Sequence, residues 1–182
     1  MRFIILVALL LLPRLANAEV AVRSTLLHGG QERIHYFFKP KQVVEPPLIV
    51  VLHGMGGNAK NLRFGIGMTD RAALAGMSVV FPQGVRLPGG ARHWNAGFRF
   101  SNTDDVGYLT TLIRKLQDEH GVSRENVFIL GLSMGGYMAY HMACRTEIPI
   151  RAIASVTGTM GGATWANCPA PAKPSILHLH GR

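Results

Sequence analysis

Acidic residues and cysteines are scarce in this chain of 182 residues, and a long apolar run is missing. Ten Asp and Glu residues are set against 19 Lys and Arg residues, which gives a formal net charge of +9. That balance could suit nucleic acid or an acidic surface, but the basic residues are scattered, without a dense run or interleaved aromatics. We therefore predict no nucleic-acid partner and assign the charge to an ordinary surface.

The N-terminus has the layout of a cleavable secretory signal. A positive start at Met1-Arg2 precedes an apolar run at Phe3–Leu12, and Ala16–Ala18 offers small residues for cleavage. The run is about ten residues long, whereas a membrane-spanning helix needs roughly twenty, so no stable membrane anchor is expected, although a retained anchor is the alternative. We predict a signal peptide over residues 1–18 and one domain over residues 19–182, secreted or periplasmic.

The chain has only two cysteines, Cys144 and Cys168. Neither has the spacing of metal ligands, so no zinc site and no cofactor is predicted. In an exported protein an even pair favours a disulfide, which would close a loop of about 25 residues and contribute roughly 3–4 kcal/mol. Two buried thiols are the alternative.

Short apolar runs alternate with segments of helical periodicity. Predicted strands cover the following runs: Ile34–Phe38, Leu48–Leu52, Met77–Phe81, Asn126–Leu130, Ala152–Val156 and Ser175–Leu179. Predicted helices cover Thr69–Ala75, a segment opened by Asp104, and Gly135–Cys144. Strands that alternate with helices indicate parallel βαβ units, so the expected class is a three-layer α/β sandwich with a mostly parallel sheet.

Two adjacent carboxylates, Asp104 and Asp105, stand where the longest predicted helix begins. Either could be read as a catalytic acid. Acidic side chains at a helix start also cap the first N–H groups and complement the helix dipole. We therefore assign both to the start of the helix.

Gly131-Leu132-Ser133-Met134-Gly135 fits the G-x-S-x-G pattern, with an apolar strand before it and a helix after it. This pattern makes a sharp strand-to-helix turn that exposes the serine hydroxyl, and the helix N-terminus favours an oxyanion nearby. Ser133 is the predicted nucleophile.

A second glycine-rich segment, His53-Gly54-Met55-Gly56-Gly57, follows the predicted strand at Leu48–Leu52. Serine hydrolases of this architecture take a backbone N–H from such a loop for the oxyanion. We predict that the N–H groups of Met55 and Met134 form the oxyanion hole. A plain glycine turn is the alternative, and a phosphate loop does not fit because no Gly-Lys-Ser or Gly-Lys-Thr follows.

These segments, with others in the same order, carry a family resemblance. The others are Phe81-Pro82-Gln83-Gly84, Trp94-Asn95, Asp104-Asp105-Val106 and His178-Leu179-His180-Gly181. From about Arg33 to the last residue the chain resembles the secreted polyhydroxybutyrate depolymerase-like esterases, which include feruloyl and acetylxylan esterases. The resemblance implies an α/β-hydrolase that cleaves carboxylic esters of extracellular polyesters or plant cell-wall polysaccharides.

The resemblance also implies roles for single residues. It makes Ser133 the nucleophile and the His53–Gly57 loop the oxyanion loop, and both cysteines fall where relatives carry cysteines. His53, Trp94 and His180 become candidates for the substrate pocket, although Trp94 could equally cap the core.

The chain departs from the family at its end, where the family carries its catalytic Asp and His. After Ser133 the only acidic residue is Glu147, and His141 lies eight residues along the helix, roughly 12 Å away. We expect an incomplete fold that lacks the final strand and helix, and an inactive chain. A non-catalytic glycan- or polymer-binding relative and a serine peptidase of the same fold stay as alternatives, and the oligomeric state stays open.

Overall fold

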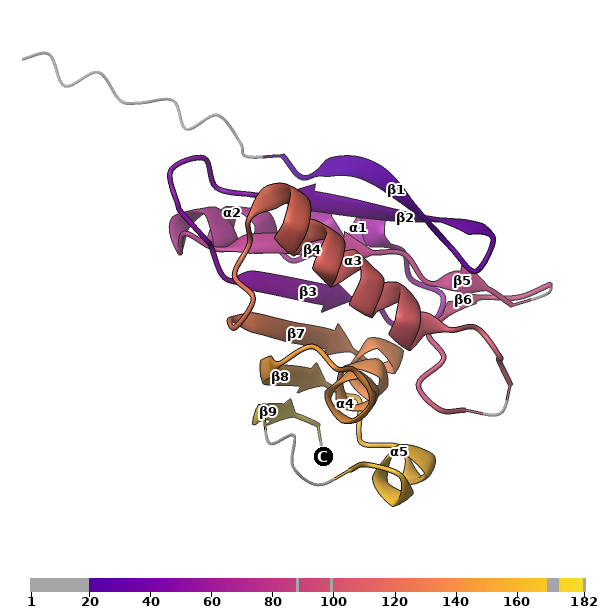
Figure 1. The fold of residues 1–182 in the computed structure, drawn as a ribbon. Helices are drawn as coiled ribbons and strands as arrows, with labels where there is room; N and C mark the ends of the chain where they lie inside the picture. Colours follow the sequence, from indigo (N-terminus) through magenta and orange to yellow (C-terminus); the bar gives the residue numbers. More distant parts are fainter. Residues whose placement is uncertain (1–19, 88, 99, 170–173, 182) are drawn as a thin grey trace, which may run out of the picture.

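The computed structural model describes residues 20–181 apart from positions 88, 99 and 170–173, so the predicted signal peptide lies outside it. A sheet of seven strands in the order β1-β2-β4-β3-β7-β8-β9 runs through the described part (Figure 1). Its strands are β1 (Val22–His28), β2 (Gln31–Phe38), β3 (Leu48–Leu52), β4 (Ser78–Pro82), β7 (Val127–Leu132), β8 (Ile150–Val156) and β9 (Ser175–Leu179). Five of these strands, β4, β3, β7, β8 and β9, are parallel to one another. The strand β2 pairs antiparallel with both β4 and β1.

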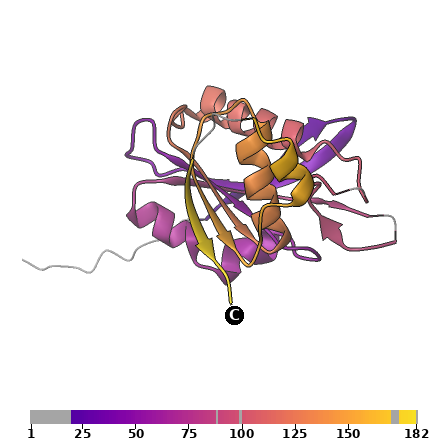
Figure 2. The same ribbon diagram turned by 90° about the horizontal axis from the view of Figure 1, so that it is seen from below.

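Helices cover both faces of this sheet, which confirms the predicted three-layer α/β class (Figures 1 and 2). They are α1 (Ala59–Gly65), α2 (Met68–Leu74), α3 (Asp105–His120), α4 (Met134–Arg145) and the short α5 (Gly162–Ala166). One core lies between the sheet and α3 and α4, and a smaller core lies under α1 and α2. A two-stranded hairpin, β5 (Val85–Arg86) and β6 (Arg92–His93), projects beyond the carboxyl ends of the parallel strands.

The apolar runs predicted most of these strands within one or two residues. The run at Leu48–Leu52 is β3, buried on both faces because helices lie above and below it. The strand β1 was not predicted, because its exposed residues lack an apolar pattern. It pairs with β2 as an antiparallel edge.

Local signals set the ends of α3. The Asp104 side chain accepts the Gly107 N–H at 2.8 Å, so Asp104 is the predicted N-cap. Gly121, in the left-handed conformation with φ 60°, ends the helix and donates its N–H to the Gln117 carbonyl.

Cys144 and Cys168 form a disulfide, as predicted from the even number of cysteines. Cys144 lies near the end of α4 and Cys168 follows α5, and their Cα atoms are 4.9 Å apart. The bond therefore fastens α5 to α4, on the same side of the sheet as α3.

Within the described residues, no helix combines the length and apolar character that crossing a membrane requires. The strand β9 pairs with β8 on one side, and its apolar side chains are open to solvent, with Ile176 53% and Leu177 56% exposed. With the neighbouring strand residues they line an apolar cavity of about 380 Å³ on the face that carries α1 and α2. Such a surface favours association or aggregation.

Candidate active site

Ser133 occupies the turn that joins β7 to α4, at the carboxyl edge of the parallel strands. Its backbone has φ 50° and ψ −116°, outside the regions that residues with a Cβ prefer, and the residue is exposed. Its N–H donates to the Val156 carbonyl at 2.7 Å, which ties the turn to the end of β8. The hydroxyl is therefore held out toward solvent by a strained and tethered backbone.

The glycines around Ser133 are required because atoms of the neighbouring chain segments lie too close to leave room for a side chain. A Cβ at Gly131 would lie 2.0 Å from the Gly135 carbonyl oxygen, and one at Gly135 would lie 2.3 Å from the Leu52 carbonyl oxygen. A Cβ at Gly136 would lie 2.2 Å from the Ser155 hydroxyl oxygen. The motif thus packs α4 directly onto β3, β7 and β8, which fixes the serine at the centre of the sheet.

The loop His53–Gly57 lies against this serine. A Cβ at Gly54 would stand 3.4 Å from the Ser133 Cβ and 3.3 Å from the Leu132 carbonyl oxygen, so only a residue without a side chain fits without displacement. The loop is closed by the Gly57 N–H on the Gly54 carbonyl and anchored by the Gly56 N–H on the Arg92 carbonyl. The structure therefore brings the two predicted glycine motifs together.

The predicted oxyanion donors have no competing partners. Among the described residues, neither the Met55 N–H nor the Met134 N–H has a hydrogen-bond acceptor. For Met134 this follows from its place in the first turn of α4, where N–H groups have no acceptor within the helix. Both N–H groups therefore have an unused donor.

The His53 side chain is hydrogen-bonded to the backbone of this loop and to the segment that follows β4. Its Nδ1 donates to the Gly54 carbonyl at 2.8 Å, and its Nε2 accepts the Gly84 N–H and the Gln83 side-chain amide, each at 3.0 Å. Burial lowers the pKa of the imidazole, which keeps it neutral in this tautomer. With both nitrogens occupied and the ring buried, His53 is not placed to line a substrate pocket or to accept a proton from Ser133.

Trp94 is also a support residue. The indole is fully buried, donates its N–H to the His53 carbonyl at 2.9 Å, and lies with its ring centre 5.1 Å from that of His53. Of the two readings of Trp94 that the sequence left open, the structure places the side chain in the core.

A buried ion pair that the sequence did not reveal completes this support. Asp105, fully buried, accepts a hydrogen bond from Arg33 at 2.6 Å and one from the Asn95 N–H at 2.7 Å. The Arg33 guanidinium lies 3.9 Å from the centre of the Tyr108 ring. Asp105 is the first residue of α3, as predicted, but it does not cap the helix, because its carboxylate turns inward to bind β2 and the Trp94-Asn95 segment. The only feature of the sequence that could have indicated this ion pair was Arg33, the residue directly before the apolar run at Ile34–Phe38.

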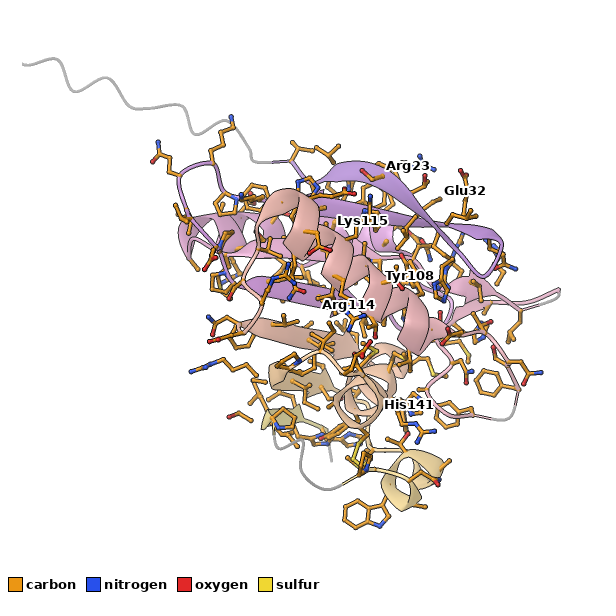
Figure 3. The ribbon with its side chains drawn as sticks, in the orientation of Figure 1. Arg23, Glu32, Tyr108, Arg114, Lys115 and His141 are labelled. Atoms are coloured by element: carbon orange, nitrogen blue, oxygen red, sulfur yellow. A yellow bond between two sulfur atoms is a disulfide. The ribbon has the colours of Figure 1, made fainter. Side chains whose placement is uncertain are left out.

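The acidic residue that follows Ser133 lies away from it. Glu147 is exposed and pairs with Arg114 of α3 at 2.8 Å. His141, on the side of α4 that faces α5, bonds the Thr164 hydroxyl at 2.7 Å, and burial lowers its pKa (Figure 3). As the helical spacing predicted, neither group contacts Ser133.

His178 of β9 and His180, just beyond that strand, make other contacts. His178 bonds the Tyr140 hydroxyl at 3.0 Å, and His180 stacks on His178 with ring centres 5.6 Å apart. Leu132, Val156 and Leu179 are aligned across β7, β8 and β9, so the end of β9 is about 10 Å from the serine turn. Within the described residues no histidine or carboxylate bonds to Ser133, and His180 is exposed at this edge.

The sequence is similar to those of known proteins. Residues 35–182 match the profile of a family described as phospholipase/carboxylesterase. A bifunctional acetylxylan esterase/xylanase of Neocallimastix patriciarum is 27% identical over 154 residues, covering 84% of this chain and 21% of that protein. Feruloyl esterase C of Emericella nidulans is 29% identical over 180 residues, covering 91% of this chain and 62% of that protein.

The solved structures agree on the fold. The acetyl xylan esterase from Aspergillus awamori superposes with a TM-score of 0.64 at 17% identity, over 78% of this chain and 53% of that chain. The fold is that of the α/β hydrolases. The chain spans less than two thirds of the length of each of these relatives.

Proposed function

Because the chain belongs to the phospholipase/carboxylesterase family, we propose that it carries the nucleophile of a serine esterase, with Ser133 forming an acyl-enzyme. The observation that carries this proposal is the exposed, strained Ser133 with the Gly54 loop packed against it. The Ser133 hydroxyl has no hydrogen-bond partner among the described residues, so no bond of this side chain offsets the backbone strain. Strained backbone of this kind persists where function requires it.

In the proposed reaction the Ser133 Oγ attacks the ester carbonyl carbon, and the carbonyl oxygen becomes an oxyanion. The free N–H groups of Met55 and Met134 donate to that oxygen, and the N-terminal end of α4 adds a favourable dipole. The tetrahedral intermediate collapses with loss of the alcohol, and water then attacks the acyl-serine to release the acid. Removing one such donor costs about 10²–10³ in rate in comparable enzymes.

The proton of Ser133 needs an acceptor that the described residues do not supply. His53 is occupied on both nitrogens, and His141 and His178 bond elsewhere. No described residue is proposed as the base or as its carboxylate partner. The chain by itself is then expected to hydrolyse esters weakly, through the oxyanion hole alone.

Ester-substituted cell-wall polysaccharides are the substrate class that we propose. The curated relatives are named acetylxylan and feruloyl esterases, which favours this class over a polyhydroxyalkanoate polyester. The apolar run and small residues at the N-terminus support export of the protein to reach such a polymer. A glycan-binding relative without turnover is the second candidate, since no proton acceptor contacts Ser133 among the described residues.

A fluorophosphonate probe tests the role of Ser133. We expect a single modified residue, Ser133, in protein recovered from an oxidising compartment, and no labelling of Ser133→Ala. Ser24→Ala, which removes an exposed hydroxyl on β1, is the matched control and should label like the parent chain. Labelling that survives in Ser133→Ala, or labelling of the parent chain at another residue instead of Ser133, would reject the assignment.

A further inference from the structure

Two histidine side chains lie side by side where β9 ends, at one edge of the described sheet (Figure 1). His178 belongs to the strand and His180 directly follows it, and both are exposed. Side chains two positions apart in an extended segment point to the same face, which explains why the two rings meet. The rings are nearly parallel, at 7°, with their centres 5.6 Å apart.

Most of the ring nitrogens of this pair are open to a ligand. His178 Nδ1 lies 3.0 Å from the Tyr140 hydroxyl of α4. By contrast, His178 Nε2 and both nitrogens of His180 have no hydrogen-bond partner among the described residues. The nitrogen of a neutral imidazole is the commonest metal ligand that proteins supply, so an exposed pair of them is a candidate site for a metal ion.

The Tyr140 hydroxyl favours the tautomer of His178 that can bind a metal. Burial raises the pKa of Tyr140, so its hydroxyl stays uncharged and can accept the Nδ1–H of His178. In that tautomer the lone pair is on Nε2. Histidines that bind metals donate their other ring N–H to a fixed acceptor in the same way, which orients the ring. The contact with Tyr140 therefore prepares His178 Nε2 as a ligand.

The spacing of the two rings suits one shared ion. Zinc lies about 2.0–2.1 Å from each imidazole nitrogen in a tetrahedral site, which puts the centres of two bound rings roughly 5 Å apart. The rings of His178 and His180 have nearly this separation, 5.6 Å. Exposed side chains change rotamer within nanoseconds, so His180 can turn one nitrogen toward an ion held by His178.

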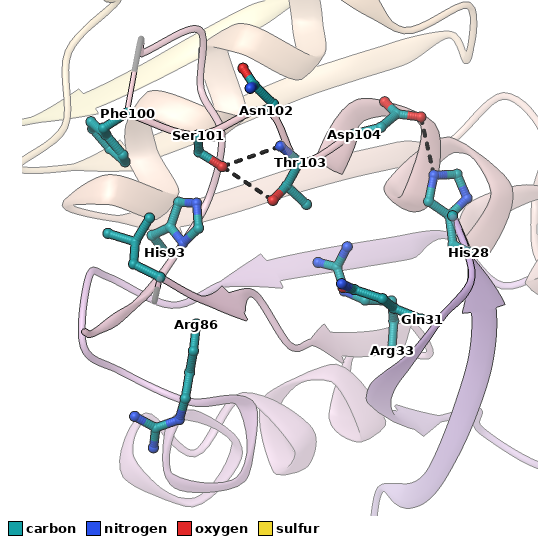
Figure 4. A pocket seen from close by; sticks show the side chains of 12 residues that line it. His28, Gln31, Arg33, Arg86, His93, Phe100, Ser101, Asn102, Thr103 and Asp104 are labelled. Carbon is teal, nitrogen blue, oxygen red and sulfur yellow. Dashed lines mark hydrogen bonds and ion pairs between the residues drawn. The ribbon is translucent and has the colours of Figure 1, made fainter. Parts of the chain in front are cut away.

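The rival pair of ligands in the described part of the chain is already occupied. His28 and Asp104 border a polar cavity of about 500 Å³, where they bond each other at 3.1 Å (Figure 4). Asp104 also accepts the Gly107 N–H as the cap of α3. No group of three or more His, Cys, Asp or Glu side chains that could hold an ion occurs within the described residues. A site built on the histidine pair therefore needs water for its remaining ligands.

We propose that His178 and His180 form a surface site for Zn²⁺ or a similar transition-metal ion, with water completing the coordination. Imidazole suits zinc, nickel and copper, whereas Mg²⁺ and Ca²⁺ take oxygen ligands. The ion links the end of β9 to α4 through Tyr140, so it stabilises the folded chain. This site goes beyond the proposed esterase function, because its ligands lie about 10 Å from the serine turn and serve none of its chemistry.

Calorimetric titration of the full chain with ZnCl₂ tests the site. Tyr140→Phe should weaken zinc binding about tenfold, the lower end of the cost of losing such an acceptor. His178→Asn and His180→Asn should each weaken it further, because one imidazole remains. His120→Asn, which removes an exposed histidine at the end of α3, is the matched control and should bind zinc like the parent chain. Circular dichroism on each variant shows that the fold is retained.

The melting temperature gives a second measurement. ZnCl₂ should raise it for the parent chain and leave it unchanged for a variant that carries both His178→Asn and His180→Asn. Absent zinc binding, or equal binding by the parent and this double variant, overturns the site. Binding that is lost in His28→Asn instead would place the ion in the cavity of Figure 4, and MgCl₂ binding more tightly than ZnCl₂ would overturn the class of ion.

Two further variants complete the test. A folded Tyr140→Phe that binds zinc as tightly as the parent chain would overturn the assignment of His178 Nε2 as a ligand. Ser133→Ala should bind zinc like the parent chain, since Ser133 contacts neither histidine. The zinc titration and the fluorophosphonate experiment can therefore fail independently of each other.

Discussion

Replacing Ser133 by glycine should make the protein more stable than replacing it by alanine. The residue has φ 50° and ψ −116°, where a Cβ collides with its own backbone. Alanine removes the hydroxyl and keeps the Cβ, so it keeps the strain. Glycine removes the Cβ and with it the strain.

The expected difference is about 1 kcal/mol. Backbone held in a disfavoured region costs about 1–3 kcal/mol, and glycine removes this cost. Glycine also makes the unfolded chain more flexible, which lowers the stability of the folded state by about 0.5–1 kcal/mol. Loss of the Ser133 hydroxyl itself is close to neutral, because it has no hydrogen-bond partner among the described residues. The melting temperature of Ser133→Gly should therefore exceed that of Ser133→Ala by about 2–4 °C.

Thermal unfolding followed by circular dichroism measures this difference, with Ser155→Gly as a contrasting control. Ser155 lies in β8 without positive φ and donates to the Gly158 carbonyl, so glycine there should destabilise. A Ser133→Gly protein that melts at or below the temperature of Ser133→Ala would show that the turn is unstrained, and would remove the main support for Ser133 as nucleophile.

Three further predictions concern the stability of the fold. In urea unfolding, Asp105→Asn should lower the free energy of unfolding by about 3–5 kcal/mol, because it leaves Arg33 buried and unpaired. Asp104→Asn should change it little, because this side chain is exposed and asparagine can still cap the helix. Reduction of the Cys144–Cys168 bond should cost about 3 kcal/mol, and an unchanged melting temperature after reductant with both thiols alkylated would contradict this. Burial lowers the pKa of His35 from 6.5 to about 4, so the unfolded chain takes up the proton first. The contribution of His35 to the free energy of unfolding should be fully present above about pH 6.5 and should fall by roughly 3 kcal/mol as the pH drops to 4. The variant His35→Leu should show a weaker dependence of the free energy of unfolding on pH over this range.

Much of the fold could be predicted because its signals are local. The run at Leu48–Leu52 is apolar throughout, and only a strand covered on both faces buries such a run. The helix after Asp104 has apolar residues on one side and a cap at its start. The edge strand β1 and the short α1 were missed, since β1 is exposed along most of its length and α1 has a single buried residue.

The sequence by itself predicted the turn at Ser133 and the glycine-rich loop His53–Gly57, because close backbone approach requires glycine at Gly54, Gly131 and Gly135, and glycines can be read directly from the sequence. Tertiary structure alone decided the roles of Asp105, His53 and Trp94. Adjacent carboxylates look alike in sequence, but α3 turns Asp104 to solvent and Asp105 toward Arg33, which lies 72 positions earlier. A buried charge is placed by the partner that compensates it, and that partner is known only once the chain has folded.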